Sequence, residues 1–229
     1  VREQVYVSES KLGLWSHYEV AFHFGKPDRA KESEILQKVS LFTEEVSRMP
    51  LIKRTSSLAD IIKESYKARN ENNPEYYKIP ENDRIINGMM LLLERTAGSS
   101  LRMWVDENYQ TLRVLIEVSD YSTSQVNEHI AFIKERTAEL FPQSTYPDFE
   151  FWLAGSSLQL SVMNQYITRG LIVSFGFALF IISILMIVVL ENIRLGLIAM
   201  IPNIAPAIVA GGLMGFLGAP LEFITMTIA

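Results

Sequence analysis

Few side chains in this sequence are suited to catalysis or metal binding. The chain has three histidines, His17, His23 and His129, and no cysteine. No histidine stands four residues from another, the spacing that puts two metal ligands on one face of a helix. We therefore predict no metal, no cofactor and no thiolate chemistry, and we interpret the histidines as exposed or half-buried polar residues.

A serine nucleophile is the next option, at Ser156 or Ser157 after Gly155. The GxSxG elbow of hydrolases is absent there, and no histidine follows in the chain. The phosphate-binding GxxxxGK[ST] pattern is absent as well, so no ATP-driven motor is predicted. We interpret residues 155–157 as a turn between a strand and a helix, and we expect that the chain is not an enzyme.

Charge is distributed very unevenly along the chain. The net charge is -5, and beyond Arg169 the only charged residues are Glu191, Arg194 and Glu222. Nucleic acid is excluded as an expected partner, because phosphate binding requires clustered cations. An ion-driven carrier needs a titratable group inside the membrane, and the long uncharged runs contain none. Any coupling residues are therefore expected outside this chain.

Two uncharged runs are long enough to cross a lipid bilayer. Residues 170–190 carry no ionisable group, and a helix of that length matches the ~30 Å hydrocarbon core. A second run covers residues 195–221, after a short polar loop. We predict a transmembrane region over 167–229, with helices at about 167–191 and 194–217 that form an all-α hairpin, and the start of a third at 222.

The second predicted helix is rich in residues that bend helices or let them pack closely. These are Pro202, Asn203, Pro206, Gly211 and Gly215, and the two glycines have the GxxxG spacing. Such residues disfavour helices of soluble proteins but recur in membrane helices. We interpret them as bend and packing positions rather than as part of a substrate path.

The part before the spans, residues 1–166, has the periodicities of a mixed α+β domain. Apolar residues alternate from Tyr18 to Phe24, and an amphipathic helix and a short strand follow up to Thr55. The same order returns late, with a strand at 112–118, a helix that a capping box at Ser122 and Gln125 would begin, and a strand at 149–153. Two βαβ halves predict a ferredoxin-like α+β sandwich.

A helical insertion is predicted between the two halves, at about residues 57–97. Ser57 and Asp60 would cap its first helix, and a polar loop leads to a second helix with a broad apolar surface. This surface includes Met89, Met90 and Leu93. Either it packs on the sandwich, or it faces a neighbouring protein or an amphipathic substrate, because methionine adapts well to variable apolar ligands.

Several runs resemble one family of membrane proteins. The segment LGLIAMIPNIAPAIVAGGLMGFLGAPLEFITMTIA, residues 195–229, resembles the resistance-nodulation-division superfamily, and more narrowly its MMPL-type and hopanoid-exporter-like predicted exporters. The runs GKPD, SLADIIKESYKA, PEYYKIP and LLLE resemble the second periplasmic porter domain of those exporters.

The resemblance implies a proton-driven antiporter of hydrophobic or amphipathic, lipid-like molecules, with many spans in the bacterial inner membrane and its large domain in the periplasm. Since the chain starts without Met and stops inside an apolar run, we interpret it as a fragment. Its expected partners are the lipid bilayer, such a substrate, the remainder of the same transporter chain and a second copy in a homo-oligomer. The alternative is a membrane-anchored extracytoplasmic sensory or scaffolding module.

Overall fold

The computed structural model describes residues 16–119 and 123–216. The chain divides into two compact units, Val1–Gln159 and Leu160–Ala229. The division falls within a single helix, a few residues before the domain boundary that was expected at 166. Each unit is described by itself below.

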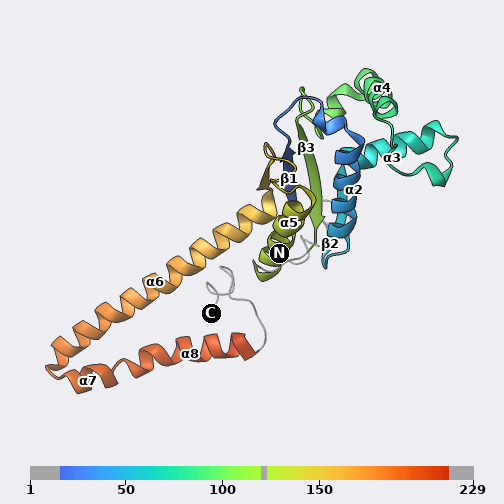
Figure 1. The fold of residues 1–229 in the computed structure, drawn as a ribbon. Helices are drawn as coiled ribbons and strands as arrows, with labels where there is room; N and C mark the ends of the chain where they lie inside the picture. The colour runs from blue at the N-terminus through green and yellow to red at the C-terminus, as the bar shows by residue number, and fades with distance from the viewer. Residues whose placement is uncertain (1–15, 120–122, 217–229) are drawn as a thin grey trace. The chain divides into compact units, whose positions relative to one another are not determined.

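The first unit is built on a sheet of four strands, β1 (Ser16–His23), β2 (Ile52–Ser57), β3 (Thr111–Val118) and β4 (Glu150–Ala154). The strand order is β2-β3-β1-β4, and every neighbouring pair is antiparallel. Strands β1 and β2 therefore run in the same direction, separated by β3 (Figure 1). The unit is thus a mixed α+β fold with an antiparallel sheet, as the sequence periodicities predict.

One face of the sheet forms the hydrophobic core. Tyr18, Val20 and Phe22 of β1 are fully buried, while the residues between them are only half-buried. Two helices cover this face, α2 (Ser33–Ser47) and α5 (Thr123–Leu140). The Phe22 ring lies 5.2 Å from the Phe42 ring of α2, with 81° between the ring planes, an edge-to-face geometry that aromatic pairs prefer.

The segment between β2 and β3, where the helical insertion is expected, contains α3 (Leu58–Arg69), a short 3-10 turn and α4 (Asp83–Leu101). Helix α4 runs past the expected end at 97 and is kinked there, because Ala97 has non-helical angles. Ser57 does precede α3, but its hydroxyl donates to the Asp60 carboxylate at 2.8 Å and makes no bond to the helix backbone. The capping box expected before α5 involves Ser122, which lies outside the described residues.

The remaining helices are α6 (Ser156–Leu190), α7 (Ile193–Ile198) and α8 (Ile201–Phe216). Helix α6 starts well before 167, directly after β4. The helix expected at about 194–217 is divided into α7 and α8 at residues 199–200. Pro202 explains where α8 begins, because proline fits the first turn of a helix, in which its missing N–H would have no partner. The span expected from 222 lies outside the described residues.

Candidate functional site

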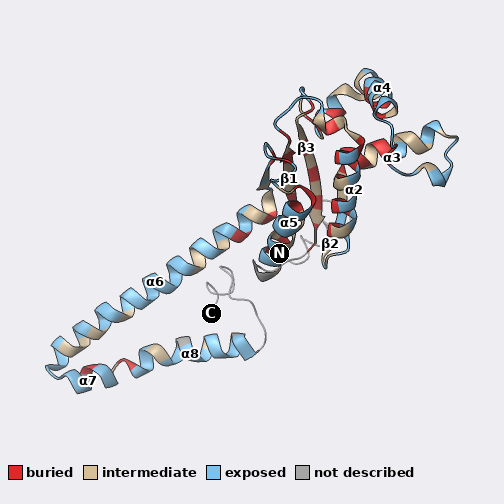
Figure 2. Ribbon diagram, viewed as in Figure 1, coloured by how far each residue is buried: buried red, intermediate tan, exposed pale blue. Residues whose placement is uncertain are grey.

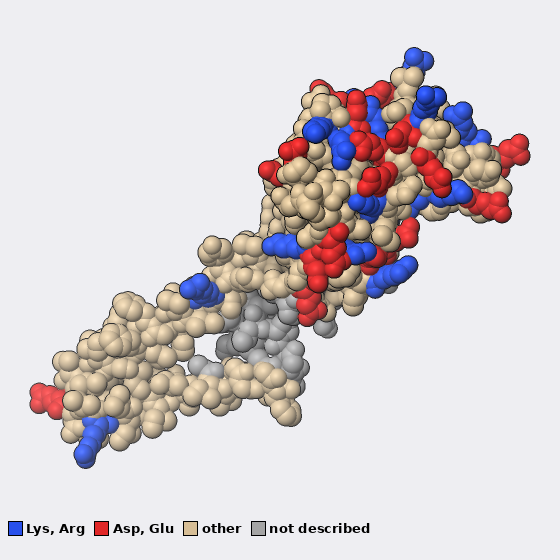
Figure 3. All heavy atoms as spheres, viewed as in Figure 1, with Lys and Arg blue, Asp and Glu red and all other residues tan. Residues whose placement is uncertain are grey.

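Two segments of the structure are long and apolar enough to cross a membrane. They are α6, with 35 residues, and residues 193–213 in α7 and α8. Their apolar side chains are mostly exposed (Figure 2), and Phe177, for example, is 63% exposed. Lys, Arg, Asp and Glu gather on the sheet domain and are sparse on these helices (Figure 3). A surface of this kind is typical of contact with lipid, because a helix in a soluble core buries its apolar side chains.

The five bend and packing positions expected in this region all lie on α8. Pro206 stands inside the helix, where it removes one backbone hydrogen bond. A Cβ added at Gly211 or Gly215 would meet no atom within 4 Å. Within the described part of the chain, the GxxxG pair therefore has no packing partner.

A different glycine makes the close helix contact in this unit. A Cβ at Gly196 of α7 would lie 2.5 Å from Cγ1 and 2.8 Å from Cα of Ile187 in α6. Only a residue without a side chain lets the two helices approach this closely. Gly196 was not among the expected site residues, although it is a small residue at the start of the second apolar run.

The expected substrate or partner face on α4 is largely inside the domain. Met89 is 4% exposed and Met90 is 2% exposed, and Leu93 packs against the same core. These side chains therefore stabilise the insertion and offer little surface to a ligand. The exposed apolar residues of this helix are Leu91 and Leu92, on its other side.

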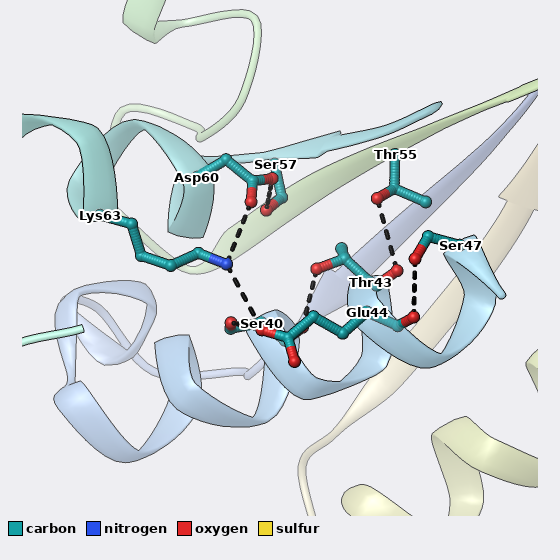
Figure 4. Close-up of polar contacts among 8 residues, drawn as sticks. All are labelled: Ser40, Thr43, Glu44, Ser47, Thr55, Ser57, Asp60 and Lys63. Carbon is teal, nitrogen blue, oxygen red and sulfur yellow. Dashed lines mark hydrogen bonds and ion pairs between the residues drawn. The ribbon is translucent and has the colours of Figure 1, made fainter. Parts of the chain in front are cut away.

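A buried cation on α3 connects this helix to α2 (Figure 4). The Lys63 ammonium lies 3.3 Å from the Asp60 carboxylate on α3 and 3.6 Å from the Glu44 carboxylate on α2. The Lys63 side chain is 8% exposed, so both carboxylates compensate a charge that would otherwise be costly to bury. Further hydroxyl groups bind Asp60 and Glu44, from Ser57 and Ser40. Each carboxylate of this cluster is bound both by a hydroxyl and by the Lys63 ammonium, and we interpret the cluster as a structural contact between α3 and α2.

The face of the sheet opposite to α2 and α5 carries a hollow of about 290 Å³. Its apolar lining includes Ala21 of β1, Trp152 of β4 and Met103 of the segment after α4. Trp152 is 50% exposed and Met103 is 53% exposed. The Arg113 guanidinium donates to Glu19 at 2.7 Å and, as the largest cause, lowers the pKa of that carboxyl below its usual value.

The other charged residues of this hollow also have partners within the protein: Arg102 lies 3.6 Å from Glu94, and the Asp106 carboxylate accepts from the backbone N–H groups of Gln110 and Thr111. The exposed surface of the hollow is mostly apolar. A small apolar group is the ligand that such a lining would accept. Sequence reasoning missed the hollow, although the outward position of Trp152 in an alternating strand was a usable signal.

The structure also brings a histidine to the first residue of α6. The His17 backbone N–H donates to Ser156 Oγ at 3.2 Å, and His17 Nδ1 lies 3.4 Å from the same oxygen. The other ring nitrogen lies 3.2 Å from Glu19, which Arg113 also binds. Since Ser156 Oγ already accepts a hydrogen bond from the His17 backbone, we interpret the contact as a structural hydrogen bond that holds the start of α6 against β1.

No three His, Asp or Glu side chains in the described ranges are grouped so that they could hold a metal ion. Comparison of the chain with protein-family models gives no match, and comparison with curated proteins gives none either.

Proposed function

We propose that this chain is part of a proton-driven exporter of the resistance-nodulation-division type, which moves hydrophobic or amphipathic, lipid-like molecules out of the cytoplasmic membrane. One observation carries the proposal. The 35-residue helix α6, which exposes apolar side chains over most of its length, begins one residue after the last strand of a folded α+β domain. Because only Gly155 separates the strand from the helix, a movement of the domain would be transmitted directly to α6.

The arrangement of the first unit supports a ferredoxin-like porter domain. Strand order β2-β3-β1-β4, with a helix after β1 and another after β3, is what two interleaved βαβ halves produce. Helices α3 and α4 would be an insertion between the halves. The close contact of Gly196 with Ile187 supports an antiparallel transmembrane hairpin of α6 with α7 and α8.

The hollow beside Trp152 supports an apolar substrate, because its exposed lining is mostly apolar and its charged groups already bind other groups of the protein. Beyond Arg169, Glu191 lies between α6 and α7, and Arg194 lies in the first turn of α7. Both are therefore at the ends of the apolar segments. We therefore propose that the proton relay belongs to the remainder of the transporter chain.

Transport is tested with the full-length protein in vesicles with an imposed proton gradient and a fluorescent phospholipid as the probe. The proposal expects gradient-dependent movement of the lipid, abolished by a proton ionophore. Trp152→Ala should lower the rate, whereas Leu41→Ala, which removes a comparably exposed apolar side chain from α2, should leave it unchanged. No movement of this lipid or of other apolar probes by the unaltered protein would refute the proposal and favour a sensory or scaffolding module.

The proposed location, with many spans in the inner membrane and the domain in the periplasm, is tested by labelling. The chain has no cysteine, so single cysteines can be introduced at Glu75 in the insertion and at Glu191 after α6, both exposed. A maleimide that cannot cross membranes should label Glu75→Cys in intact cells and Glu191→Cys only after permeabilisation. The reverse pattern would place the domain in the cytoplasm.

A further inference from the structure

The imidazole of His129 is buried between three segments that are distant in the sequence. It belongs to α5 and is 3% exposed. Its Nδ1 lies 3.2 Å from the hydroxyl of Tyr18 in β1, and its Nε2 lies 3.0 Å from the carbonyl oxygen of Pro50, in the turn between α2 and β2. The two rings also meet edge to face, with centroids 5.8 Å apart.

These contacts define the tautomer of the neutral ring. A carbonyl oxygen only accepts hydrogen bonds, so Nε2 carries the hydrogen and donates it to Pro50. In the neutral ring Nδ1 is then an acceptor, and the Tyr18 hydroxyl donates to it. A second proton on Nδ1 would turn this acceptor into a donor and leave a cation in the core.

Within the described ranges, no carboxylate hydrogen-bonded to the ring compensates that cation. The titratable groups around the ring in these ranges are the Tyr18 phenol, from β1, and the Glu128 carboxylate, next to His129 on α5. The contact from the turn after α2 is a carbonyl oxygen. Farther along the packing of α2 on α5, Glu45 is bound to Arg136 at 2.8 Å. Burial lowers the pKa of His129 below 6.5, and the Pro50 bond and Glu128 oppose the shift only in part.

We propose that His129 is a pH-sensitive clamp. In its neutral form it holds α5 and the α2–β2 turn against β1, and its protonation releases them. This device does not depend on transport, because the contacts lie wholly within the α+β domain. It makes the packing of that domain respond to the acidity of the compartment that it faces.

The direction of the response follows from linkage. A histidine whose folded pKa is lowered binds fewer protons in the folded state than in the released one. The stability that the neutral His129 ring contributes is therefore fully present above pH 6.5, the ordinary pKa of histidine, and is lost as the pH falls below that value. Each pH unit of acidification, down to the folded pKa, favours the released state by up to about tenfold.

The test is hydrogen exchange of the full chain in detergent at about pH 7.5 and about pH 5.5, read in peptides that cover residues 49–57 and 123–140. Exchange in the unaltered protein, corrected for the intrinsic rate at each pH, should rise several-fold at the lower pH. His129→Gln keeps a donor for Pro50 but cannot gain a proton, so this rise should disappear. His23→Gln, a half-buried histidine on the other sheet face, should retain it.

An equal rise in the unaltered protein and in His129→Gln would overturn the clamp. If His129→Gln fails to fold, the ring resonances of His129 in the unaltered protein decide by NMR titration. A midpoint below 6.5 together with loss of the Tyr18 contact supports the clamp, and a midpoint at or above 6.5 overturns it.

Discussion

Gly155 is the single residue that connects β4 of the sheet to α6, and its replacement is the sharpest test of this structure. Strand β4 ends at Ala154 and α6 begins at Ser156. Gly155 has φ of +113°, a conformation that L-residues rarely adopt. A Cβ there would lie 2.4 Å from the His17 carbonyl oxygen and 2.9 Å from the Tyr18 Cα, both of which are backbone atoms.

The substitution Gly155→Ala therefore carries two costs. Holding alanine at this φ costs about 1–3 kcal/mol, and forcing a methyl group against a packed strand costs about 1–3 kcal/mol more. We expect the free energy of unfolding to fall by about 2–6 kcal/mol. As the control, Gly88→Ala in α4 meets no atom within 4 Å and should stabilise by about 0.5–1 kcal/mol.

The assay is urea unfolding of the full chain in detergent, followed by tryptophan fluorescence. The free energies of unfolding are compared between variants whose dependence on urea concentration, the m-value, is the same. If the free energy of unfolding of Gly155→Ala is within about 0.5 kcal/mol of that of the unaltered chain, the close contact of Gly155 with β1 is wrong. Equal losses in both variants would instead indicate that the measurement does not report on local backbone geometry.

Three further predictions use the same preparation. Phe22→Ala should lower the free energy of unfolding by about 3–5 kcal/mol, because the ring is fully buried among other aromatic rings, and urea unfolding checks this. Met90→Glu should prevent stable folding, whereas Leu92→Glu should change stability by about 0.5 kcal/mol or less, because Met90 is 2% exposed and Leu92 is 62% exposed; thermal melts of the pair decide. The Arg113 hydrogen bond is the largest cause that lowers the pKa of Glu19 below 4.5. The stability that the ionised Glu19 carboxylate contributes is therefore present above pH 4.5 and is lost on further acidification. Glu19→Gln should flatten the fall in stability below that pH in acid titrations.

Much of the fold followed from local periodicity. The alternation around Val20 predicted β1, and the buried residues of that strand are the predicted ones. Such patterns are readable because each side chain in a strand points to the face opposite its neighbour's. Helix α6 begins before the predicted start at about 167, because residues 156–166 include polar side chains and yet continue the same helix.

The candidate sites could not be predicted from local periodicity alone. The pattern of α4 showed an apolar surface, but only packing decided that Met90 is buried and that Leu92 is exposed. Ser156 had no histidine after it in the chain, and the structure supplied His17 from 139 residues earlier. The hollow beside Trp152 likewise joins β1, β3, β4 and the segment after α4.

The sequence by itself determined the alternating strands, the amphipathic helices and the two long apolar segments, since each depends on residues that are neighbours along the chain. Tertiary structure alone decided which apolar faces are covered and that His129 lies between Tyr18 and Pro50. The physical reason is that burial and hydrogen bonding are set by whichever groups the fold brings together, and here those groups lie 111 and 79 residues apart.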